Sequence, residues 1–64
     1  MDLEALEQLL ADLMERRAEA GERISRAQAA GDATALAQAR ADYRRWHNRA
    51  SEVARQLERK RRGQ

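Results

Sequence analysis

The sequence predicts an all-α fold, a two-helix antiparallel coiled-coil hairpin, on the strength of two observations. Apolar residues recur at alternating spacings of three and four along both halves of the chain, which is the 3.5-residue period of a coiled coil. The only break in this pattern with capping chemistry lies at Gly31-Asp32, near the middle. We therefore expect one domain over 1–64, with a first helix at about 3–30, a turn at 31–32, a second helix at about 33–61 and a basic tail at 59–64.

The turn is predicted from the two residues at its centre. Gly31 suits the position just after a helix, where the backbone turns left-handed and a residue without Cβ does so freely. Asp32 suits the start of the next helix, because its carboxylate can accept hydrogen bonds from free backbone N–H groups. Asp2 can cap the first helix in the same way. So short a connection makes the two helices antiparallel neighbours.

The apolar stripes of the two helices define a predicted seam. In the first helix the stripe consists of Leu3, Leu6, Leu10, Leu13, Arg17, Ala20, Ile24 and Ala27. In the second helix it consists of Leu36, Ala39, Tyr43, Trp46, Ala50, Val53, Leu57 and Lys60. Folding the chain at the turn sets small residues against large ones near the turn, as close packing requires.

Three seam residues carry specific expectations. We expect Tyr43 and Trp46 in the seam, and Arg17 facing Trp46 in a cation–π contact. Gly21 has two interpretations, either making room for the Tyr43 ring or having no special role.

Length and composition predict that the hairpin does not act alone. A 64-residue hairpin buries one seam only, and chains this small usually need a disulfide, a metal or a partner. The chain has no Cys and one His, so a disulfide and a conventional zinc site are not expected. We expect a homodimer forming a four-helix bundle, or docking on a helical protein partner. Neither a membrane-spanning run nor a signal peptide is visible, which predicts a cytoplasmic protein without a membrane role.

One flank of the hairpin is rich in small residues that would let another helix approach closely, whereas the opposite flank is charged. We predict that this small-residue side is a protein interface. Its candidate residues are Leu6, Leu10, Ala11, Leu13, Met14, Ala18, Gly21, His47, Ser51 and Ala54.

The charge distribution supplies an alternative. Residues 1–30 carry seven acidic and four basic residues, whereas residues 31–64 carry four acidic and nine basic ones. Helix-dipole and cross-helix charge pairing explain this asymmetry without nucleic acid. The alternative is an RNA- or DNA-binding dimer whose second helix contacts phosphates. Its candidate residues are Arg40, Arg44, Arg45, Arg49, Arg55 and Arg59.

Catalysis finds little support in the residues. Hydroxyl groups occur only at Ser25, Thr34, Tyr43 and Ser51, and two packed helices do not enclose a pocket. We expect no enzyme activity, no cofactor, no metal site and no small-molecule substrate. The predicted function is that of a helical-hairpin interaction protein, such as an adaptor, an inhibitor or a small structural subunit.

Overall fold

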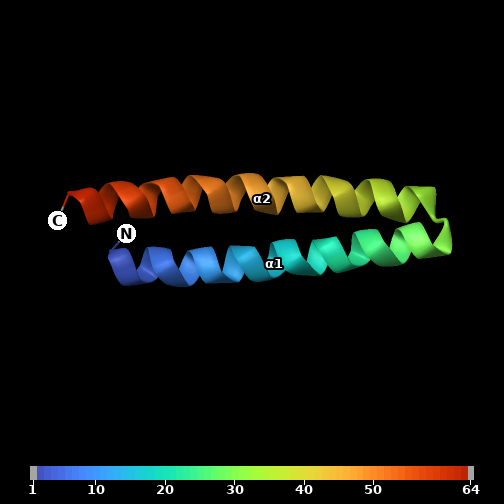
Figure 1. Cartoon of the computed structure of the whole chain (residues 1–64), viewed down its shortest axis with the longest axis horizontal. Helices are drawn as coiled ribbons and strands as arrows, with labels where there is room; N and C mark the ends of the chain where they lie inside the picture. The colour runs from blue at the N-terminus through green and yellow to red at the C-terminus, as the bar shows by residue number, and fades with distance from the viewer. Residues whose placement is uncertain (1, 64) are drawn as a thin grey trace.

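Two helices packed side by side make up the molecule (Figure 1). A computed structural model describes residues 2–63 of the chain. Helix α1 spans Leu3–Ala30 and helix α2 spans Ala33–Arg62, and no strand occurs in the described part. The principal extents are 49 × 14 × 13 Å, so the hairpin is a short rod with both termini at one end. The predicted hairpin is confirmed.

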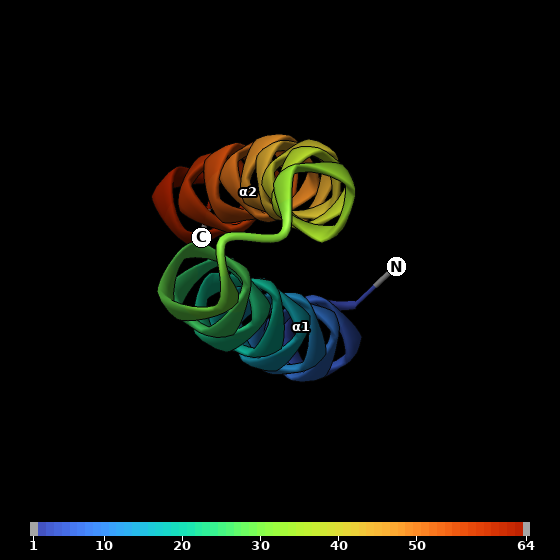
Figure 2. The same ribbon diagram turned by 90° about the vertical axis from the view of Figure 1, so that its right-hand side faces the viewer.

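The turn consists of two residues whose backbone groups are satisfied (Figure 2). Gly31 has φ 67° and ψ 26°, in the left-handed region. Its N–H donates to the carbonyl of Gln28 at 3.2 Å, and the N–H of Asp32 donates to the carbonyl of Ala27 at 3.0 Å. This pair of bonds is a Schellman motif. Asp32 then caps α2, because its side chain accepts from the N–H of Ala35 at 3.0 Å.

The outer ends of both helices are held by side chains. Asp2 caps α1 by accepting from the N–H of Ala5 at 2.7 Å. Helix α2 continues through Arg62, one residue beyond its predicted end, so most of the basic tail is helical. Ion pairs of Arg61 with Glu7 and of Arg62 with Glu58 help to fix this last turn. Positive charge at a helix C-terminus is also favoured by the helix dipole. Gln64 lies outside the described residues.

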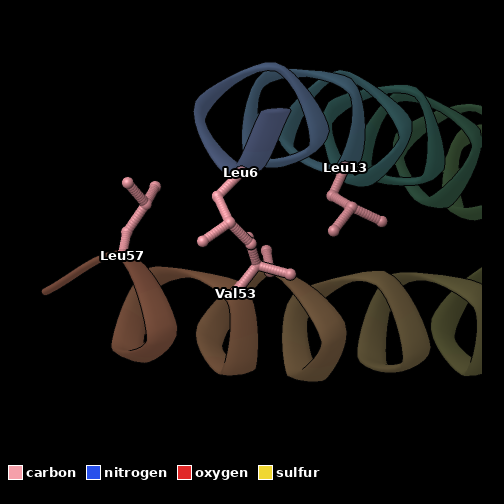
Figure 3. Packing of buried hydrophobic residues seen from close by; sticks show 5 residues of the cluster. Leu6, Leu13, Val53 and Leu57 are labelled. Atoms are coloured by element: carbon pink, nitrogen blue, oxygen red, sulfur yellow. The ribbon is translucent and has the colours of Figure 1, made fainter. Parts of the chain in front are cut away.

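The core is small and unequal along its length. Its buried side chains are Leu6, Leu13, Ala20, Ala27, Ala39, Ala50, Val53 and Leu57. The large ones lie toward the open end, where Figure 3 shows them between the helices. Near the turn the fully buried residues are alanines, and there the ribbons run closer together (Figure 1). Alanine permits close helix approach but contributes little buried apolar surface.

Alternate positions of the predicted stripe are less buried than expected. In α1, the residues at seven-residue intervals from Leu6 are buried, while Leu3, Leu10, Arg17 and Ile24 are only half-buried. A single partner helix covers one narrow line of side chains, so the neighbouring line remains partly open.

Tyr43 departs furthest from its predicted place. Its side chain is 37% exposed, so it lies at the edge of the seam rather than inside it. Trp46 is half-buried and packs against the core cluster. The predicted register is closely matched, since Arg23 would face position 40 and pairs instead with Asp42, half a turn further along α2.

Candidate protein interface on one flank of the hairpin

The predicted interface residues divide between the seam and one open face. Leu6 and Leu13 are 2% and 5% exposed, so they lie between the helices and not on the open face. Leu10 is half-buried at the boundary. The others follow one side of the hairpin, which we call the small-residue flank. Its members are Ala11, Met14, Ala18, Gly21, His47, Ser51 and Ala54, of which Gly21 and Ser51 are half-buried and the rest exposed.

A shallow apolar groove runs along the open-end half of the small-residue flank. Its largest part has a volume of about 540 Å³ and is lined by Glu7, Leu10, Ala11, Met14, Ala54, Leu57, Glu58 and Arg61. A second hollow of about 190 Å³ adjoins it, because both are lined by Leu10, Met14 and Ala54. Met14 is 46% exposed, which is unusual for so large an apolar side chain on a chain with so small a core.

Polar contacts between the helices mark both ends of the groove. Toward the termini, Arg61 and Glu7 form an ion pair at 3.8 Å. Toward the middle, Arg17 Nη1 lies 3.1 Å from His47 Nδ1. A guanidinium can only donate, so Nδ1 must be the acceptor and the imidazole must be neutral with its proton on Nε2. The apolar groove is therefore a bounded stretch with a charged gate at each end.

Aromatic packing continues the flank beyond the Arg17–His47 contact. The Tyr43 ring lies parallel to that of His47, with centroids 6.2 Å apart and 6° between the planes. The same ring covers Gly21, where an added Cβ would stand 3.6 Å from Cε2. The ring does lie against the Gly21 backbone, as one interpretation predicted, but that distance is ordinary contact and leaves room for a methyl group.

The opposite flank is charged and internally paired. Trp46 is flanked by two guanidinium groups, with Arg16 and Arg45 at 5.2 and 5.0 Å from its ring centroid. These replace the predicted contact of Arg17, whose position in the stripe points it to the other flank and to His47.

Asp42 ties the two helices together on the charged flank. It pairs with Arg23 of α1 at 2.8 Å and with Arg45 of its own helix at 3.1 Å. The hydrogen bond from Arg23 lowers the pKa of Asp42 below its usual value. Because its charges already find partners within the chain, this flank is the weaker candidate for an interface.

The arginines predicted to contact nucleic acid do not form one surface. Arg45 is engaged by Asp42 and Trp46, and Arg49 by Glu52 at 3.2 Å. Within residues 2–63, the other four form no ion pair. They are Arg40, Arg44, Arg55 and Arg59, all of them exposed.

Reasoning from the sequence missed the charged residues that bound the groove. Glu7 and Arg61 stand beside the stripe in their helices, and that position could have indicated a cross-helix pair. Among residues 2–63, no three His, Asp or Glu side chains converge to hold a metal ion. Neither α1 nor α2 is long and apolar enough to cross a bilayer. No protein-family model, curated protein or solved structure matches the chain.

Proposed function

We propose that the protein is a non-enzymatic interaction module whose small-residue flank packs against helices of a second copy or of a helical partner. The observation that carries this proposal is the apolar groove. It is lined by Leu10, Met14 and Leu57 with the small side chains Ala11 and Ala54 at its rim. Long side chains are excluded from the rim, so the backbone of another helix can approach closely. A coupling role of this kind suits an adaptor, an inhibitor or a small structural subunit.

The size of the core supports the same proposal. Half of the eight buried residues are alanines, and Val53 is the largest side chain with under 2% exposure. Ordering the backbone costs about 1–2 kcal/mol per residue, which burial must offset. Covering the groove would bring Leu10, Met14 and Leu57 into one continuous core with the seam. Binding would then supply part of the folding free energy.

Ala54→Glu tests the proposed interface. Ala54 lines both hollows of the groove and is exposed in the hairpin, so the substitution adds charge without disturbing the seam. In a packed interface it would leave an unpaired buried charge, at a cost of about 3 kcal/mol or more. We expect the dissociation constant of the self-associated form to rise at least ~100-fold.

The matched control is Gln56→Glu. It adds the same charge to the same helix on the opposite flank, where Gln56 is exposed. Sedimentation equilibrium at several concentrations measures both variants, with helix content followed by circular dichroism. The control should assemble like the parent chain. A parent chain that is monomeric at all concentrations and melts cooperatively would remove self-association from the proposal, and equal behaviour of both variants would remove the flank.

A second candidate function is binding of RNA or DNA by α2. Three of its arginines with no ion pair within residues 2–63, Arg44, Arg55 and Arg59, lie on the side of α2 that turns away from the seam. Their replacement by Gln should reduce the slope of log affinity against log salt by about 0.7–0.9 for every phosphate that is no longer neutralised. Arg45→Gln and Arg49→Gln are the controls, because their partners are within the chain. Absence of binding to mixed RNA and DNA at low salt would exclude this function.

A further inference from the structure

The two helices contribute opposite charge to the small-residue flank. Helical periodicity places Glu4, Glu7, Glu15 and Glu22 on this side of α1, and this side of α1 has no Lys or Arg. We call these four residues the acidic strip. On α2 the same side carries the basic strip, which consists of Arg40, Arg44, Arg55, Arg61 and Arg62. Glu58 is the only acidic residue among them. All of these side chains are exposed.

Several of these charges have no counter-charge in the single hairpin. Glu7 and Arg61 pair with each other across the groove, and Glu22 pairs with Arg26 of its own helix. Within residues 2–63, neither Glu15 nor any of Arg40, Arg44 and Arg55 forms an ion pair. The strips therefore present unmatched charge of opposite sign on either side of one groove.

Two symmetric arrangements can bring a second hairpin onto this flank. If the two-fold axis lies along the rod, both turns lie at the same end and α1 of one copy covers α2 of the other. If the axis crosses the rod, the turns lie at opposite ends and each helix covers its own counterpart. Both give antiparallel neighbours and a four-helix bundle. The first sets the acidic strip on the basic strip, whereas the second sets like charge on like charge.

We infer that the occupant of the groove is a second copy of this chain, packed with its turn at the same end. This inference rests on the proposed function and specifies the partner. At matching heights along the rod, Glu22 comes beside Arg40 and Arg44 of the other copy, and Glu15 comes beside Arg44. The contact is reciprocal, so each pairing forms twice. A face of 49 by 14 Å spans about 690 Å², close to the ~800 Å² that each partner buries in a stable interface.

Distances between spin labels separate the two arrangements. The chain has no cysteine, so a single introduced one gives one label per copy. Ala29→Cys lies next to the turn and Glu19→Cys lies near the middle of the rod, and both positions are exposed. With helix axes 8–10 Å apart, same-end packing should give distances below about 35 Å for both labels. Opposite-end packing leaves the Glu19→Cys distance short and moves the Ala29→Cys distance beyond about 40 Å, since the rod is 49 Å long.

Charge reversal gives an independent readout. Glu15→Lys with Glu22→Lys should weaken dimerisation at least about tenfold at low salt, because both new lysines then face arginines. Mixing this variant with an Arg40→Glu, Arg44→Glu variant should restore assembly. Opposite-end packing predicts no weakening from the lysine variant alone, since like charges already face each other there. A long Ala29→Cys distance with a short Glu19→Cys distance overturns the same-end inference and leaves the interface standing, whereas absence of any distance between copies overturns self-association as well.

Discussion

Gly21 and Gly31 provide a matched pair of substitutions with opposite expected signs. Gly21 lies inside α1 with ordinary helical geometry, and a Cβ there would meet Tyr43 Cε2 at 3.6 Å and Cδ2 at 3.9 Å. Both are normal van der Waals distances. Gly31 has φ 67°, and a Cβ added there would have no atom within 4 Å. Space is therefore no obstacle at either glycine, and backbone conformation decides the outcome.

Gly21→Ala should stabilise the hairpin. Replacing Gly by Ala within a helix gains about 1 kcal/mol, and the new methyl group adds contact with the Tyr43 ring. We expect the free energy of unfolding to rise by about 1–1.5 kcal/mol and Tm by about 5–10 °C. Gly31→Ala should lower stability by about 1–2 kcal/mol, the cost of a left-handed conformation for a residue with Cβ.

Urea unfolding followed by circular dichroism measures both variants, and each is followed at two protein concentrations so that assembly does not mask the effect. The reasoning fails if Gly21→Ala is neutral or destabilising at both concentrations, because Tyr43 would then need the bare backbone. It also fails if Gly31→Ala unfolds like the parent chain, since the turn would not need its left-handed residue.

Two further predictions concern the ties between the helices. Asp42→Asn should lower stability at neutral pH, because the parent pKa is depressed by Arg23; the parent contribution is present above the unfolded value of 3.8 and lost as pH falls through the lower folded value, so the variant should show a flatter acid limb in unfolding curves measured from neutral to acid pH. Leu57→Ala should cost about 2–4 kcal/mol, against less than half of that for Leu36→Ala, because Leu57 is 3% exposed and Leu36 is half-buried; equal losses would contradict the described core.

The sequence was sufficient for those parts of the structure that depend on local chemistry. Gly31 and Asp32 stop one helix and start the next through bonds within a few residues, so the turn was predictable. Which side a large ring takes depends on all of its neighbours in space. Tyr43 moves out over Gly21 and Trp46 settles between Arg16 and Arg45, neither of which the stripe alone indicates.

The candidate site was predictable only in outline for the same reason. Small residues on one flank were visible in the sequence, and their exposure agrees with the prediction. Leu6 and Leu13 were included because a stripe does not reveal how completely one helix covers it. The groove itself, and its closure by Glu7 with Arg61 and by Arg17 with His47, depends on contacts about thirty or more residues apart.

The unequal core also has a consequence for the rate of folding. Segments beside the turn meet after closing a short loop, whereas Leu6 and Leu57 are 51 positions apart. Going from a loop of ~12 residues to one of ~51 costs about 1.3 kcal/mol more chain entropy. The hairpin therefore closes first where it has only alanines to bury, and its leucines meet last. Substitutions near Gly31 should then slow folding, while those at the leucine end should chiefly hasten unfolding.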